Sequence, residues 1–107
     1  MIDLGNLQQL TEGDAPLMKT LLDEFLNTTE EDLSSLDRAV KNQEGSEIAS
    51  LAHRIKGSSL IVGASRLTAL TEELEEAGKR SDTGKFKPLL LDIRECYDGV
   101  SEAIKNL

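Results

Sequence analysis

The sequence predicts an all-α protein, an antiparallel up-down-up-down four-helix bundle with a short additional N-terminal helix. Three observations lead to this fold class. Apolar residues recur with the period of an amphipathic helix along most of the chain, and no segment alternates like a strand. The connections between the periodic segments are short, which favours antiparallel neighbours. We therefore expect residues 1–107 to form one domain.

The first two predicted helices are separated by a turn at Gly13. A short amphipathic segment, LGNLQQL, ends near this glycine and is expected to cover one end of the bundle. Asp14 is placed to cap the next helix, with Pro16 in the first turn, where its missing N–H costs little. A long apolar stripe then continues until Gly45, which we expect to end the helix. The stripe contains Leu17, Leu21, Leu22, Phe25, Leu26, Leu33, Leu36 and Val40.

Three more helices are predicted after this glycine. Ser46 is expected to cap the first, and Gly63 to end it in the left-handed conformation. Ser65 is expected to cap the second, which stops at the turn-rich segment GKRSDTGK. Pro88 lies early in the last helix. The stripes are Ile48, Leu51, Ala52, Ile55, Ser59 and Val62, then Leu67, Leu70, Leu74 and Ala77, and finally Phe86, Leu89, Leu90, Ile93, Tyr97, Val100 and Ile104.

The composition argues against several classes of function. A formal net charge of -8 opposes binding to nucleic acid, which requires clustered Lys and Arg, and to anionic lipid. No apolar run approaches the roughly 20 residues that span a bilayer. Cys96 is the only cysteine, so the chain has no internal disulfide, which fits a reducing compartment. It lies near the apolar stripe of the last predicted helix, where we expect it to act as a small buried hydrophobic residue.

The only histidine projects away from the predicted core. At about 100° per residue, the core residues of its helix lie within roughly 60° of Ile48. The four residues of a second face lie between roughly 80° and 180° from it. We call this second face the histidine face; it consists of His53, Lys56, Gly57 and Leu60.

Gly57 is the unusual member of this face. Glycine inside a helix costs about 1 kcal/mol relative to alanine, and close packing does not account for a residue turned away from the core. Its presence suggests that a large partner must reach the ring of His53, whose neutral nitrogen is a good nucleophile near neutral pH. Lys56 could neutralise a phosphoryl group there, and Leu60 could contact the partner. Each residue alone also fits an ordinary surface position, and Leu60 also fits packing against the preceding helix or a neighbouring loop.

The segments AHRIKGSS, GASRL and ELEEAGK carry a family resemblance. They resemble the histidine-containing phosphotransfer (HPt) domain of bacterial phosphorelays, especially the C-terminal domain of hybrid sensor kinases. The resemblance implies that His53 is phosphorylated on Nε2, that Lys56 steadies the phosphoryl group and that Gly57 leaves room for a receiver domain. The residues expected to contact this partner are Leu60, Arg54 and Ser58.

The resemblance also implies a residue that orients the imidazole. In the family, a polar residue on the next helix often bonds the other ring nitrogen, which fixes the tautomer and leaves the lone pair of Nε2 free. The counterpart in this sequence is Glu75. The alternative is that Glu75 is one of several glutamates on a solvated face, with Glu72, Glu73 and Glu76.

The expected function is reversible phosphoryl transfer between His53 and a receiver aspartate. The receiver would bring Mg²⁺, and we expect this chain to bind no cofactor or metal. It has no P-loop and no glycine-rich nucleotide loop, so we expect neither ATP binding nor autophosphorylation. The expected form is a cytoplasmic monomer, either a separate protein or the tail of an inner-membrane sensor kinase.

Other classes of function remain open. The main alternative is a helical docking module in which His53 is incidental and no phosphoryl group is transferred. A hydrolase built on His53 with Cys96 or a serine lacks any nucleophile motif. A zinc site lacks ligands, because one histidine and one cysteine rarely form one.

Overall fold

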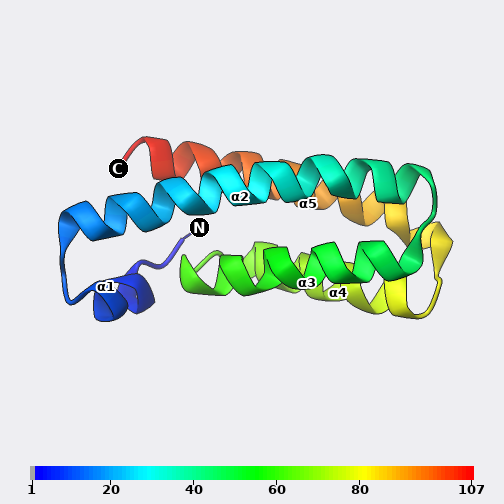
Figure 1. The fold of residues 1–107 in the computed structure, drawn as a ribbon, viewed down its shortest axis with the longest axis horizontal. Coiled ribbons are helices and arrows are strands. Elements are labelled where there is room, and N and C mark those ends of the chain that lie inside the picture. Colours follow the sequence, from blue (N-terminus) through cyan, green and yellow to red (C-terminus); the bar gives the residue numbers. More distant parts are fainter. Residues whose placement is uncertain (1) are drawn as a thin grey trace.

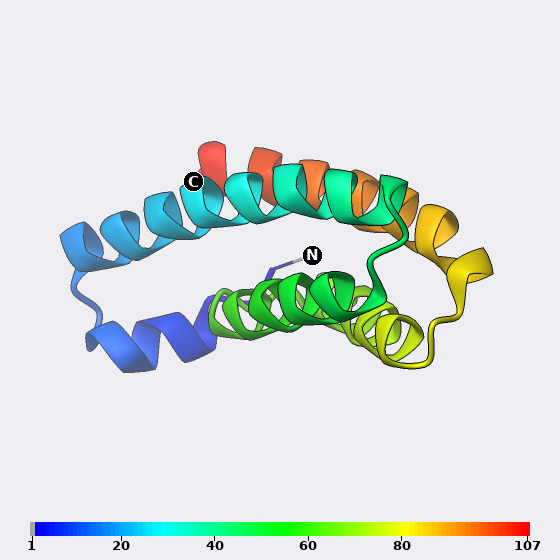
Figure 2. The ribbon, with the colours of Figure 1, turned by 45° about the vertical axis from the view of Figure 1, so that its right-hand side comes forward.

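The chain folds as two layers of antiparallel helices. The computed structural model describes residues 2–107 and contains no strand within them. In Figures 1 and 2, α2 and α5 form one layer, α3 and α4 form the other, and α1 lies below the first turns of α2. The predicted up-down-up-down bundle is confirmed. The helices are α1 (Gly5–Thr11), α2 (Ala15–Lys41), α3 (Gly45–Ile61), α4 (Ser65–Lys79) and α5 (Phe86–Lys105), with a 3₁₀ turn, η1 (Thr83–Lys85), before α5.

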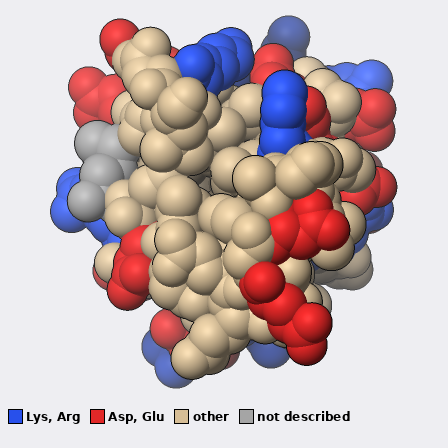
Figure 3. All heavy atoms as spheres, turned by 90° about the vertical axis from the view of Figure 1, so that its left-hand side faces the viewer, with Lys and Arg blue, Asp and Glu red and all other residues tan. Residues whose placement is uncertain are grey.

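The core contains most of the predicted stripe residues. Leu7 of α1 is completely buried, so the N-terminal helix covers one end of the bundle as predicted. Leu17 was wrongly assigned to the core, since it is 43% exposed. It lies at the start of α2, where the chain extends beyond α3 and α4 (Figure 1). Figure 3 views this end, whose centre carries mostly uncharged residues. Cys96 is half-buried, and burial raises the pKa of its thiol.

The helix ends follow the predictions only in part. The Asp14 carboxylate accepts a hydrogen bond from the Leu17 N–H at 3.0 Å, so the predicted cap is confirmed. Gly63 adopts the predicted left-handed conformation after α3, with φ of 71°. Ser46 and Ser65 were wrongly predicted as caps. Helix α3 begins at Gly45, two residues earlier than a Ser46 cap implies, and α4 begins at Ser65, one residue earlier than a Ser65 cap implies; neither has a side-chain cap.

Gly45 begins α3, whereas the sequence predicted that it would end α2. The turn is already complete at this point, because α2 ends at Lys41 and Gln43 takes the left-handed conformation. The glycine has a packing role instead. A Cβ on Gly45 would lie 2.7 Å from the carbonyl oxygen of Gly78, and one on Gly78 would lie 2.7 Å from that of Gly45. This backbone contact sets the distance between α3 and α4.

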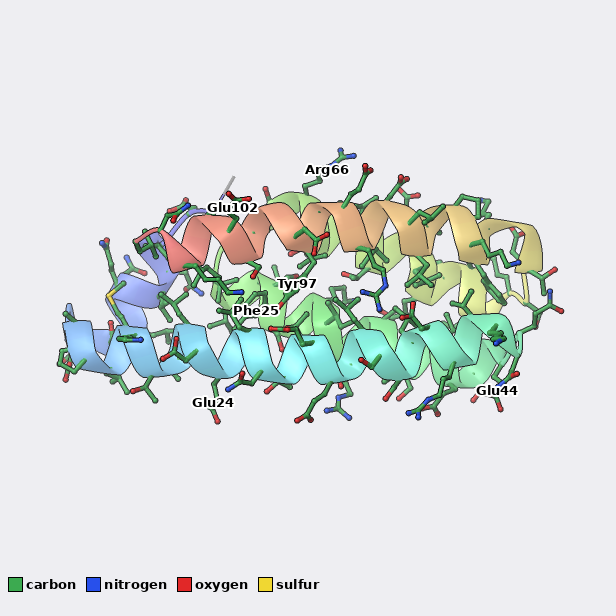
Figure 4. The ribbon with its side chains drawn as sticks, turned by 90° about the horizontal axis from the view of Figure 1, so that it is seen from above. Glu24, Phe25, Glu44, Arg66, Tyr97 and Glu102 are labelled. Atoms are coloured by element: carbon green, nitrogen blue, oxygen red, sulfur yellow. The ribbon has the colours of Figure 1, made fainter. Side chains whose placement is uncertain are left out.

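Helices α2 and α5 are joined by aromatic and polar contacts. Figure 4 shows Phe25 of α2 and Tyr97 of α5 facing each other between the helices, with ring centroids 6.2 Å apart. The Tyr97 hydroxyl donates to the Leu26 carbonyl oxygen at 3.2 Å, and Arg94 forms an ion pair with Asp37. Within residues 2–107, no helix is both long and apolar enough to cross a membrane.

Candidate functional site

The histidine projects from α3 toward solvent while its ring is held on one side. The side chain of His53 is 67% exposed. Its Nδ1 atom lies 3.1 Å from Oε2 of Glu75, which comes from α4. No group among residues 2–107 forms a hydrogen bond with Nε2. One ring nitrogen is therefore held by the protein, and the other is free to react.

Glu75 is covered by cationic side chains rather than facing solvent. The residue is only 6% exposed, although its neighbours Glu72, Glu73 and Glu76 are exposed. Lys56 Nζ lies 2.8 Å from Oε1 in an ion pair whose angles do not suit a hydrogen bond. Lys79 Nζ lies 3.2 Å from Oε2. The solvated-face alternative for Glu75 is thus excluded by its burial.

The charge of Glu75 determines the tautomer of the imidazole. The Lys56 contact, together with Lys79 and against the effect of burial, lowers the pKa of Glu75 to about 2. The same contact raises the pKa of Lys56. An ionised carboxylate can only accept hydrogen bonds, so Nδ1 of His53 must carry the proton in this contact. In the neutral ring, Nε2 then keeps its lone pair.

Gly57 and Leu60 are exposed beside this ring. A Cβ placed on Gly57 would meet no atom within 4 Å, so helix packing does not require a glycine here. Leu60 is 57% exposed, so more than half of its surface is available to a partner. Lys56 differs from these residues, since its side chain is only 22% exposed and turns toward α4. The structure thus brings three of the four residues to the surface.

Arg54 and Ser58 lie on the opposite flank of α3, toward α2. Arg54 Nη2 lies 3.2 Å from Oδ1 of Asp32, a buried α2 carboxylate. Burial raises the pKa of Asp32, and Arg54 opposes this shift. Ser58 is half-buried in a small hollow that it shares with Ile61 of α3 and residues of α2. The residues predicted for partner contact are therefore divided between two flanks of the helix.

Sequence reasoning missed two residues of this region. Lys79 stands four residues after Glu75, and this spacing places the two on one side of a helix. Asp32 stands three residues after Thr29 and four before Leu36, which places it at the edge of the apolar stripe. These spacings are visible in the sequence and could have identified Lys79 and Asp32. Among the described residues, no group of three or more His, Cys, Asp or Glu side chains is arranged to hold a metal ion.

Comparisons with known proteins agree with this geometry. The family model for the Hpt domain matches residues 20–103. The crystal structure of histidine-containing phosphotransfer protein B (HptB) from Pseudomonas aeruginosa PAO1 is similar, with a TM-score of 0.92 and 28% identity over 98% of this chain and 91% of that one. The HPT domain of a sensor hybrid histidine kinase from Shewanella shares the fold, with a TM-score of 0.81 and 20% identity. This match also covers 98% of this chain and 91% of that one. No curated protein matches significantly. Because this family model matches most of the chain, including the histidine face and Glu75, the chain belongs to the Hpt domain family.

Proposed function

We propose that His53 is the residue that carries the phosphoryl group in the phosphorelay. It accepts the group on Nε2 from the aspartyl phosphate of a receiver domain and passes it to the aspartate of another. The observation that carries this proposal is the contact of Nδ1 with the ionised Glu75, 3.1 Å away, on an otherwise exposed ring. It leaves the reactive lone pair on the solvent-exposed side of the contact.

The transfer step needs no additional acid or base. The lone pair of Nε2 attacks phosphorus, a P–N bond forms, and the P–O bond to the receiver aspartate breaks with its electron pair remaining on that carboxylate. The proton stays on Nδ1, so the ring becomes positively charged. The carboxylate of Glu75 stabilises this charge through its hydrogen bond. The reverse step restores the neutral ring, which makes the transfer reversible.

Lys56 supplies positive charge for the incoming phosphoryl group. Its ammonium is paired with Glu75 in this structure, one helical turn from His53. The lysine stem is flexible and its ammonium is a compact charge, so the side chain can exchange the carboxylate for the phosphoryl group. Lys56 therefore serves two anions in turn.

The receiver docks over the surface around His53. Gly57 leaves the ring accessible, Leu60 offers an apolar contact, and Arg54 and Ser58 extend this surface toward α2. Mg²⁺ enters with the receiver, and this chain binds no cofactor. We further propose that the chain is a monomer, because the apolar stripes are used within the bundle, and that it works in the cytoplasm.

The proposal is tested by incubating the chain with a panel of phosphorylated receiver domains. We expect transferred label that is acid-labile and alkali-stable, and no label on His53→Gln. Glu76→Gln is the matched control, because Glu76 is exposed on α4 and pairs with Arg80 away from the ring. Binding of receivers without transfer to the wild type would overturn the proposal in favour of a docking module.

A further inference from the structure

We propose that Lys79 is a positioning residue for phosphotransfer. It keeps the Glu75 carboxylate in place and balances its charge when Lys56 leaves for the phosphoryl group. This inference rests on the proposed function of His53. It concerns a residue outside the histidine face, to which the sequence analysis assigned no role.

The two oxygens of Glu75 have different partners. Oε1 lies beside Lys56, at 2.8 Å. Oε2 lies 3.2 Å from Lys79 and 3.1 Å from Nδ1 of His53. Lys79 therefore holds the same oxygen that orients the imidazole, whereas Lys56 holds the other. Departure of Lys56 from Oε1 leaves the contact at Oε2 intact.

The charges around the ring show why one lysine does not suffice. Before transfer, Glu75 and the two ammonium groups carry a net charge of about +1 beside a neutral ring. The phosphoryl dianion and the imidazolium add about −1, which leaves the cluster near neutral. Without Lys79, the phosphorylated cluster would carry a net negative charge. Glu72 and Glu76, which also act on Lys56, would add to this repulsion.

Lys79 is needed because the side chain of Glu75 is a charged carboxylate. An amide at residue 75 could accept the same Nδ1–H bond without bringing a charge. A carboxylate that loses Lys56 stays beside a dianion and needs another cation to keep its position. Lys79 is the remaining ammonium in contact with it, from the next turn of the same helix. Lys79 and Glu75 should therefore act as a unit, and removing one should remove the effect of the other.

The test is a double-mutant cycle in single-turnover transfer from a phosphorylated receiver. Variants are Lys79→Gln, Lys79→Arg, Glu75→Gln and the double variant Glu75→Gln/Lys79→Gln. Arg80→Gln is the matched control, because it removes the adjacent cation, which pairs with Glu76 instead. We expect Lys79→Gln to slow transfer about fivefold, as for loss of one partly exposed ion pair, and Lys79→Arg to restore the rate. In the Glu75→Gln background, Lys79→Gln should have no further effect.

A second measurement separates positioning from a general structural effect. The ¹³C shift of the Glu75 carboxyl should titrate at a higher pKa in Lys79→Gln and at the wild-type pKa in Arg80→Gln. Equal transfer rates for wild type and Lys79→Gln, with His53 labelled in both, would overturn this inference alone. Equal slowing by Lys79→Gln in both backgrounds would also overturn it. If His53 is not labelled in the wild type, the proposed function fails, and the inference fails with it.

Discussion

The ring of His53 on α3 is held at Nδ1 by the carboxylate of Glu75 on α4, 3.1 Å away. This contact joins two helices, so the orientation of the reactive nitrogen depends on how α3 and α4 pack. Their distance is set by the backbone contact between Gly45 and Gly78. The packing of the bundle and the chemistry of the histidine are thus linked.

Glu75→Gln should remove part of the acid sensitivity of the fold. The folded-state pKa of Glu75 is lowered to about 2 from 4.5, so its stabilising effect is fully present above 4.5 and is lost as the pH falls toward 2. Wild type should therefore be more stable than Glu75→Gln at pH 7, and the difference should shrink between pH 4.5 and 2. Urea unfolding at several pH values measures it. A difference independent of pH would contradict the role of the ionised carboxylate.

Glycine-to-alanine substitutions should have opposite effects at two places. Gly57→Ala should stabilise the protein by about 0.5–1 kcal/mol, because the site is helical and its Cβ would meet open space. Gly78→Ala should destabilise it by about 1–3 kcal/mol, because the Cβ would clash with the Gly45 carbonyl oxygen and with Ala49. Chemical denaturation measures whether each variant is more or less stable than the wild type. Destabilisation by Gly57→Ala would show that this glycine is needed by the fold.

Gly57→Leu should slow phosphotransfer while the fold is retained. The added side chain would stand one helical turn from the ring, in space that is open in this structure. Ser46→Leu is the control, since it adds the same bulk at an exposed residue near the start of α3. Transfer rates from a phosphorylated receiver should fall for Gly57→Leu only. Unchanged transfer in Gly57→Leu would contradict the interpretation that Gly57 gives the receiver access to the ring of His53.

The helix caps give a prediction on stability alone. Asp14→Ala should cost about 1 kcal/mol, because its carboxylate accepts the Leu17 N–H at the start of α2. Ser46→Ala and Ser65→Ala should change stability by less than about 0.5 kcal/mol, since neither serine caps a helix. Thermal unfolding of the three variants compares them. An equal loss in all three would contradict the assignment of Asp14 as the cap.

Helical periodicity was sufficient to predict the bundle and the exposure of His53, Gly57 and Leu60. These properties follow from the angle between residues of one helix. The start of α3 was less predictable, because Gly45 fits a helix stop as well as a close contact with Gly78, and only the packed structure separates the two.

The surroundings of Glu75 could not be predicted from a single helix, because they depend on contacts between helices. The burial of Glu75 and the Lys56 contact follow from how α4 lies against α3, which no single helix specifies. The family resemblance supplied Glu75 as a candidate. It did not supply Lys79, although the spacing of Lys79 from Glu75 is visible in the sequence.

The most direct test of the central claim is the site of phosphorylation on the ring. His53 is the only histidine, so a sample with ¹⁵N-labelled histidine gives signals from one imidazole. After transfer from a phosphorylated receiver, we expect a one-bond ³¹P–¹⁵N coupling at Nε2, with Nδ1 uncoupled. Coupling at Nδ1, or a phosphorylated chain whose imidazole shows no coupling, would contradict the account.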